Sequence, residues 1–191
     1  RAAVEYVAKP LTTAGLVAVA CTLDPVHADM RTAFVVALVL SLFGDVFLML
    51  PGERWFVFGL ASFLLAHVAY VVGFAIGPGD GGGLLVGAVI AAAVAIPMGT
   101  RLVRAVRRTA PALVVPVVLY VSVIASMVAC ATGWGNAWAV VGAWLFFVSD
   151  TLIGETRFVH REWGATRWAP VAIIVTYHLG QAGLVLSLVH R

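Results

Sequence analysis

Residues 111–131 read PALVVPVVLYVSVIASMVACA, and no charged side chain interrupts this run. The hydrocarbon core of a bilayer is about 30 Å thick, and a helix needs roughly 20 apolar residues to cross it. The run is therefore long enough for one helical crossing. A closed barrel also satisfies the backbone in lipid, but its strands alternate apolar and polar residues. The unbroken apolar character of this stretch favours a helix.

The rest of the chain has the same character. Of its 191 residues, 62% are hydrophobic and 11% are charged, and the mean hydropathy is +1.04. An ordinary soluble domain is about 45–50% apolar and about 25% charged. These values exclude a soluble globular protein and a disordered chain, and the presence of only two cysteines excludes a disulfide scaffold.

We therefore expect an all-α, polytopic membrane helix bundle that forms a single integral membrane domain over residues 1–191. Seven spans are predicted, at residues 4–23, 32–50, 55–76, 84–100, 111–131, 136–154 and 168–189. The glycine-rich run 77–83 is predicted to be a flexible linker. Because the chain begins with arginine and its first span starts almost at once, we expect that upstream residues are missing. No signal peptide pattern is present at this end.

Lysine and arginine are divided unequally between the two sides of this seven-span arrangement. One side receives ten of the twelve, namely Arg1, Lys9, Arg54, Arg101, Arg104, Arg107, Arg108, Arg157, Arg161 and Arg167. Only Arg31 and Arg191 fall on the other side. Short cytoplasmic loops carry such an excess, so we expect these basic loops to be cytoplasmic, in a bacterial-type cell membrane. The basic excess then records orientation rather than nucleic-acid binding, and the arginines of residues 101–108 can also attract anionic lipid headgroups.

Asp45 and Asp150 are the acidic residues that fall well inside predicted spans. A charged group at the centre of a membrane helix costs at least about 2.5–3.5 kcal/mol, so an intramembrane carboxylate indicates a function. Both spans run toward the cytoplasmic side. At about 1.5 Å per residue, both carboxylates are expected roughly 6–8 Å inside that boundary, where they can meet in one pocket.

Other polar side chains of the first, third and seventh spans can reach the same depth. They are Lys9, His67, Tyr70, Tyr177, His178 and Gln181. Lys9 is either a snorkelling residue or a counter-charge for one carboxylate. A counter-charge would keep one carboxylate ionised while burial keeps the other protonated, which makes an acid and a base of the two. No metal-ligand spacing and no serine triad is recognisable, so we expect no metal and no cofactor.

Several short motifs include these positions. They are Lys9-Pro10-Leu11, Gly44-Asp45, Gly59-Leu60-Ala61-Ser62-Phe63 continuing to His67 and Tyr70, Ser149-Asp150, and Tyr177 with Gln181. In their order and spacing they resemble the YhhN family of small multipass proteins, which includes the transmembrane lysoplasmalogenases. The resemblance covers nearly the whole chain. Members of the family are typically read as eight-helix proteins, which implies that one helix is absent upstream of Lys9.

The resemblance implies hydrolysis of the vinyl-ether bond of lysoplasmalogens to a fatty aldehyde and glycerophosphocholine or glycerophosphoethanolamine. The implied partners are a lysophospholipid substrate and membrane lipids. Protonation of the β-carbon gives an oxocarbenium ion that water attacks, so the reaction needs an acid, an anion and a base. We expect one of Asp45 and Asp150 to be the acid and the other to be the electrostatic stabiliser and base.

The remaining polar residues are expected to assist this pair. His67, Tyr70 and Gln181 would orient water or the headgroup, and Lys9 would tune the carboxyl pair or bind phosphate. Two alternatives stay open. Paired intramembrane carboxylates with histidine are also typical of a proton-coupled transporter of small molecules or lipids. His67 and His178 could instead ligate haem from facing helices.

Overall fold

The computed structural model describes residues 2–77 and 79–189, with side chains described from Ala8 onward. Every regular element within these residues is helical. The long helices are α1 (Ala2–Thr22), α2 (Ala28–Met49), α3 (Glu53–Ile76), α4 (Gly81–Thr109), α5 (Val114–Trp134), α6 (Ala137–Gly154) and α7 (Trp168–Leu186). Short helical turns join α4 to α5 and α6 to α7, namely η1 (Pro111–Leu113), η2 (Glu155–Val159) and η3 (Arg161–Ala165).

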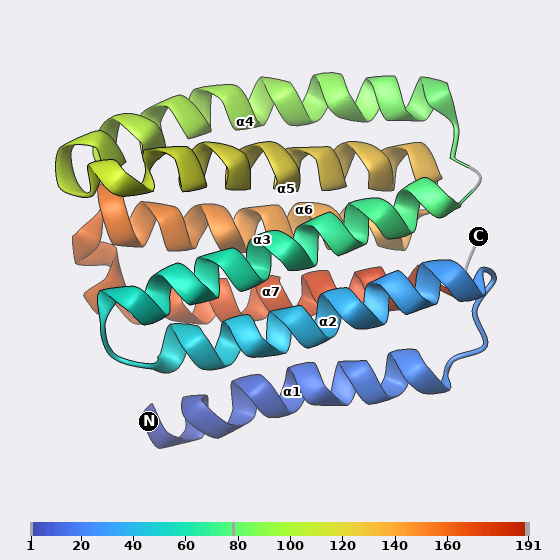
Figure 1. Cartoon of the computed structure of the whole chain (residues 1–191), viewed down its shortest axis with the longest axis horizontal. Coiled ribbons are helices and arrows are strands. Elements are labelled where there is room, and N and C mark those ends of the chain that lie inside the picture. The colour runs from blue at the N-terminus through green and yellow to red at the C-terminus, as the bar shows by residue number, and fades with distance from the viewer. Residues whose placement is uncertain (1, 78, 190–191) are drawn as a thin grey trace.

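The long helices lie side by side and alternate in direction along the chain (Figure 1). α2 packs mainly on α3, α4 on α5, and α6 on α7, while α5 also contacts α3 and α6. α1 lies at one edge, against α2 and α7. This order brings the start of α1, the α2–α3 turn, the α4–α5 turn and the η2–η3 segment to the same end of the bundle.

We call this end the basic end. Its described lysine and arginine residues are Lys9, Arg54, Arg101, Arg104, Arg107, Arg108, Arg157, Arg161 and Arg167. Arg31 lies at the opposite end, near the start of α2. Arg1 and Arg191, which were also assigned to sides of the membrane, lie outside the described residues. The unequal distribution of charge predicted from the sequence is thus present among the residues that the structure describes.

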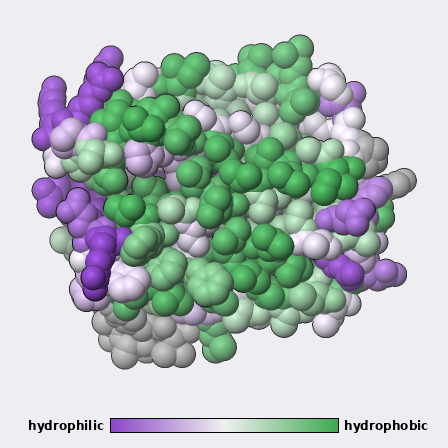
Figure 2. Space-filling model, in the orientation of Figure 1, coloured by the Kyte–Doolittle hydropathy of each residue, from purple (hydrophilic) through white to green (hydrophobic). Residues whose placement is uncertain are grey.

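Six stretches of the described chain are long and apolar enough to cross a membrane. They are Ala28–Met49, Glu53–Ile76, Gly81–Thr109, Pro111–Trp134, Ala137–Val159 and Trp168–Leu186. Figure 2 shows hydrophobic residues over the middle of one face and hydrophilic residues gathered toward its two ends. Large apolar side chains such as Leu85 and Val115 are 67% exposed, which suits a surface that faces lipid. The chain is an all-helical integral membrane protein.

The predicted spans agree with the helices to within a few residues except at α4. We expected that span to end at residue 100, but the helix continues to Thr109, so the basic residues of this region belong to a helix and not to a loop. Leu102 and Val106 are buried in a cluster with residues of α5 and η1. Arg101 Nη2 also lies 3.1 Å from Glu155 Oε2. These contacts stabilise the helix beyond its apolar part.

The start of α4 also differs from the prediction. The carboxylate of Asp80 accepts a hydrogen bond of 2.6 Å from the backbone N–H of Gly83, which is an N-cap. The glycines at 81–83 therefore form the first turn of α4 rather than part of a flexible linker.

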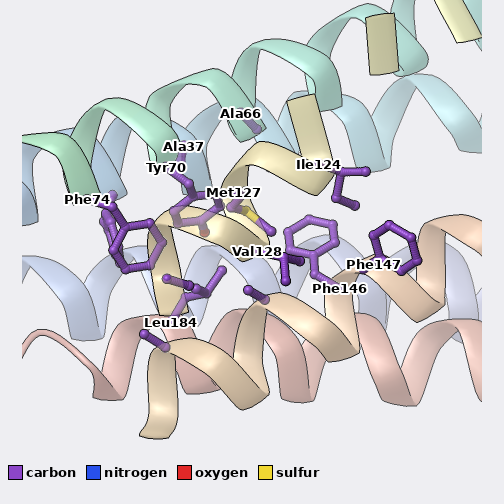
Figure 3. Packing of buried hydrophobic residues seen from close by; sticks show 14 of the residues in the cluster. Ala37, Ala66, Tyr70, Phe74, Ile124, Met127, Val128, Phe146, Phe147 and Leu184 are labelled. Atoms are coloured by element: carbon purple, nitrogen blue, oxygen red, sulfur yellow. The ribbon is translucent and has the colours of Figure 1, made fainter. Parts of the chain in front are cut away.

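Aromatic residues fill the core between α2, α3, α5 and α6. Figure 3 shows Tyr70 and Phe74 on one side of Met127 and Phe146 and Phe147 on the other. Small residues allow neighbouring helices to approach closely, as is usual in membranes. A Cβ at Gly142 would lie 2.7 Å from the carbonyl oxygen of Gly180, so α6 and α7 touch through their backbones. This contact fixes α6 and its Asp150 against α7.

Two other parts of the sequence motifs hold helices together. A Cβ at Gly44 would lie 2.6 Å from the ring of Phe63, and the hydroxyl of Ser62 donates a hydrogen bond of 2.6 Å to the carbonyl of Leu40. Both contacts join α2 to α3. The hydroxyl of Ser149 donates to the carbonyl of Ile173 at 3.1 Å and joins α6 to α7. The motif residues next to each aspartate are therefore packing residues.

Candidate functional site

Asp45 lies in α2, completely buried, among three donors from two other helices. Lys9 Nζ of α1 is 2.9 Å from Oδ1. The hydroxyls of Thr13 and Tyr177 each donate to Oδ2 at 2.7 Å. The structure thus pairs Lys9 with Asp45, which is one of the roles expected for it. We call these four residues the Asp45 set, and it ties α1, α2 and α7 together.

Asp150 of α6 has different surroundings. The hydroxyl of Tyr120, on α5, donates to its Oδ2 at 2.5 Å. His67 Nε2, on α3, lies 3.5 Å from the same oxygen. The other ring nitrogen of His67, Nδ1, is 2.6 Å from the carbonyl of Phe63, and since a carbonyl only accepts, Nδ1 carries a proton. We call Asp150, Tyr120 and His67 the Asp150 set.

The two sets are neighbours without being joined by a hydrogen bond among the described residues. Phe146 lies between them, with its ring centroid 5.3 Å from that of Tyr177 and 4.6 Å from that of His67. The ring of Phe63 is 5.7 Å from that of Tyr177. Aromatic rings therefore separate the two carboxyl groups, which we expected to meet in one pocket.

A cavity of about 60 Å³ lies beside the Asp150 set. Apolar side chains of α2 to α6 and η2 form most of its wall, and Tyr120, Asp150 and Thr151 contribute polar groups. One water needs about 10–15 Å³ by this measure, so a few water-sized or methylene groups fit. Asp150 lines this cavity and Asp45 does not. A group that enters this cavity would therefore meet Asp150 rather than Asp45.

The other candidates from the sequence lie near the two sets but outside the cavity. The Tyr70 hydroxyl and both polar atoms of the Gln181 amide are buried without a hydrogen-bond partner among the described residues. Nδ1 of His178 donates to the carbonyl of Ile174 at 3.0 Å. Its Nε2 lies 3.4 Å from the carbonyl of Lys9, whereas His67 faces Asp150. The two histidines therefore occupy different contact sets, which gives haem ligation no support.

Sequence reasoning missed two residues, Thr13 and Tyr120. Thr13 is one helical turn after Lys9, and this spacing could have indicated a shared partner. A threonine in a membrane helix commonly bonds to its own backbone, however, so the signal is weak. Tyr120 lies alone in a charge-free span, and nothing in its local sequence marks it. Only the packing of α5 against α3 and α6 brings it to Asp150.

Comparison with known proteins places the chain among membrane proteins of one family. The sequence profile of the YhhN family matches residues 4–188. Proteins of Mycobacterium bovis and Mycobacterium tuberculosis, both named lysoplasmalogenase, are 34% identical over 152 residues. The human lysoplasmalogenase TMEM86B is 31% identical over 153 residues.

These matches cover 75% and 79% of this chain but only 56% of the mycobacterial proteins and 61% of the human protein. No solved structure matches the chain significantly. The family profile extends over almost every described residue, including both aspartate sets. The chain belongs to the YhhN family.

Proposed function

We propose that the protein hydrolyses the vinyl-ether bond of lysoplasmalogens and releases a fatty aldehyde and glycerophosphocholine or glycerophosphoethanolamine. The observation that carries this proposal is the Asp150 carboxyl group at an apolar cavity, where its Oδ2 contacts the hydroxyl of Tyr120 and Nε2 of His67. Relatives at 31–34% identity are named lysoplasmalogenases, which supports the same reaction here.

The Asp150 set is suited to hold the proton that the reaction consumes. Because Nδ1 of His67 carries a proton toward Phe63, a neutral ring presents a lone pair at Nε2. That lone pair and Oδ2 of Asp150 are 3.5 Å apart, and two lone pairs would repel each other there. One proton shared between the carboxyl group and the imidazole removes this repulsion. The apolar cavity wall also disfavours a bare carboxylate.

The steps of the reaction balance with this single proton. Asp150 gives its proton to the β-carbon of the vinyl ether, and the α-carbon becomes an oxocarbenium ion bonded to the ether oxygen. A water molecule adds to the α-carbon, and the Asp150 set takes up the proton that it loses. The hemiacetal then breaks its bond to the glycerol oxygen, which leaves as a hydroxyl, and the aldehyde is released. Tyr120 donates to the carboxylate that exists between the two proton transfers.

The Asp45 set would act on this reaction at a distance, because the rings of Phe63 and Phe146 separate it from the Asp150 set. Three donors hold the Asp45 carboxyl group in place, and we assign to it an electrostatic role in stabilising the oxocarbenium ion. Tyr70 and Gln181 have buried polar atoms without protein partners, and such atoms usually bind internal water. We assign them to positioning water, while His178 contacts the Lys9 carbonyl and positions α1.

The number of spans and the orientation of the bundle in the membrane are part of the proposed function. We propose that α1 is a seventh span beside the six apolar stretches, that the described helices form one membrane domain, and that the basic end is cytoplasmic in a bacterial-type cell membrane. The excess of arginine at that end supports this orientation. Both aspartates lie near the basic end of their helices, so substrate would come from the cytoplasmic leaflet.

The proposed activity is tested with purified protein in detergent and two lipids of equal chain length. A 1-alkenyl lysophosphocholine should yield aldehyde, whereas the 1-alkyl lysophosphocholine should not, because a saturated ether has no double bond to protonate. Failure to release aldehyde from the alkenyl lipid would exclude the hydrolase and leave a carrier role to be tested.

A further inference from the structure

A second hollow lies at the basic end, directly outside the cavity of Asp150. This outer cleft has a volume of about 610 Å³ and is bounded by α1, the α2–α3 turn, the α4–α5 turn, η2 and η3. It shares four lining residues with the inner cavity, namely Leu48, Phe56, Ile153 and Phe158. The rings of Phe56 and Phe158 form an edge-to-face pair with centroids 6.0 Å apart. This pair is the boundary between the outer cleft and the inner cavity.

The outer cleft is charged, unlike the cavity behind it. Its ionisable lining residues are Lys9, Glu53, Arg157 and Arg161. Lys9 is already paired with Asp45, and its side chain is 15% exposed. Arg157, Arg161 and Glu53 are exposed, and the structure gives none of them an ion pair among the described residues. The cleft therefore offers two uncompensated guanidinium groups and one uncompensated carboxylate.

One of these guanidinium groups is held in place. Arg157 Cζ lies 4.1 Å from the centroid of the Phe56 ring, in a cation–π contact. The same phenylalanine lines the inner cavity. A group bound to Arg157 is consequently held at the mouth of the passage that leads to Asp150. Guanidinium groups bind phosphate through paired hydrogen bonds, and a carboxylate attracts an ammonium group.

We propose that the outer cleft binds the zwitterionic headgroup of a lysophospholipid, with the phosphate on Arg157 and Arg161 and the ammonium on Glu53. This inference rests on the proposed hydrolysis for the identity of the lipid. The glycerol would pass the Phe56–Phe158 pair, and the vinyl ether with the first carbons of its chain would enter the cavity of Asp150. The charged outer cleft and the apolar inner cavity follow each other in the same order as the headgroup and the hydrocarbon chain of such a lipid.

The test measures binding of 1-alkyl lysophosphocholine, which cannot be hydrolysed, and of 1-alkylglycerol, which lacks the headgroup. Charge-assisted hydrogen bonds to one guanidinium contribute about 1.5–3 kcal/mol, which corresponds to about 10- to 100-fold in affinity. The double variant Arg157→Gln, Arg161→Gln should weaken binding of the phosphocholine lipid by at least this factor and leave binding of alkylglycerol unchanged. Unchanged alkylglycerol binding also shows that the variant is folded.

Two further variants sharpen the assignment. Arg108→Gln removes an exposed arginine of the same end that does not line the cleft, and it should leave both affinities unchanged. Glu53→Gln should weaken binding of the phosphocholine lipid but not of 1-alkylglycerol 3-phosphate, which has no ammonium group. Equal loss of affinity with Arg108→Gln, or no loss with the double variant, would overturn the headgroup site.

The outcomes separate this site from the proposed reaction. Arginine-dependent lipid binding without aldehyde release would keep the headgroup site and exclude the hydrolase. Aldehyde release with arginine-independent binding would keep the hydrolase and exclude this site. Inorganic phosphate is the last probe, because a site for soluble phosphate would bind it as tightly as the lipid, and that result would overturn the assignment to a lipid headgroup.

Discussion

The hydroxyl of Tyr120 donates a hydrogen bond of 2.5 Å to Oδ2 of Asp150. Nε2 of His67 lies 3.5 Å from the same oxygen. In the proposed reaction Asp150 is negative after it gives up its proton, and Tyr120 stabilises that state. Tyr120→Phe removes the donor but keeps the ring, whose centroid is 5.3 Å from that of His67. A hydrogen bond to a charged group contributes about 1.5–3 kcal/mol.

We therefore expect Tyr120→Phe to slow aldehyde release by about tenfold or more and to change the unfolding temperature in detergent only slightly. Initial rates at saturating lipid, measured beside thermal unfolding, check both parts. An unchanged rate would show that the Tyr120 hydroxyl does not act on Asp150 during the reaction.

The ion pair between Lys9 and Asp45 couples the contributions of these two residues to stability. Asp45→Asn leaves the Lys9 ammonium without its partner, and breaking a buried ion pair costs about 3–5 kcal/mol. The cost should be lower here because the Lys9 side chain is 15% exposed. The double variant Lys9→Met, Asp45→Asn should be less destabilised than the sum of the two single variants. Chemical unfolding of all four proteins in detergent measures this coupling, and strictly additive losses would contradict it.

The sequence predicted Asp45 and Asp150 because carboxylates inside apolar spans are rare and costly. It could not predict their different surroundings. Whether an aspartate is surrounded by Lys9, Thr13 and Tyr177 or faces an apolar cavity depends on side chains from other helices. Helix periodicity states which residues share a face, but not which face of a neighbouring helix it meets.

At the scale of the helices, backbone contact between α6 and α7 is the feature on which the site depends. α6 carries Asp150 and α7 carries Tyr177, so a change in their spacing would move both aspartate sets. A Cβ at Gly142 would lie 2.7 Å from Gly180 O and 2.8 Å from Leu184 N. Neither backbone atom can move without shifting α7.

Gly142→Ala is therefore expected to destabilise the protein by about 1–3 kcal/mol, the usual cost of overpacking. Gly15→Ala in α1 is the matched control, because a Cβ there meets nothing within 4 Å. The control should be neutral or slightly stabilising, since alanine favours a helix by up to about 1 kcal/mol over glycine. Thermal unfolding in detergent measures both. Equal shifts for the two variants would show that the α6–α7 contact is not tight.

The positions of the helices could be predicted from the sequence, whereas the ends of the helices were harder to predict. Apolar runs located α2, α3, α5, α6 and α7 to within a few residues. For α4 the arginines after residue 100 indicated a loop, although arginine is itself a good helix former. Burial of Leu102 and Val106, which decides the length of that helix, comes from tertiary packing that a window of local hydropathy does not detect.

The proposed orientation of the whole molecule determines which end of the bundle a reagent outside the cell can reach. Cysteine is introduced at exposed positions near opposite ends, Asp29 and Glu162, in a chain that carries Cys21→Ser and Cys130→Ser. On intact cells a membrane-impermeant thiol reagent should label Asp29→Cys and not Glu162→Cys, because the basic end is proposed to be cytoplasmic. An epitope fused ahead of residue 1 should need permeabilised cells if α1 is a span. Labelling of Glu162→Cys on intact cells would reverse the orientation.

Protonation of a vinyl-ether carbon by Asp150 is tested most directly by the reaction in D₂O. Wild-type protein and Asp150→Asn are each mixed with alkenyl lysophosphocholine. The aldehyde is reduced at once to the alcohol, and the mass of the alcohol is measured by mass spectrometry. The wild type should release aldehyde with one deuterium on the carbon next to the carbonyl, because the proton that Asp150 donates comes from solvent. Asp150→Asn should release none above background. Aldehyde without deuterium from the wild type, or equal release from Asp150→Asn, would contradict the mechanism.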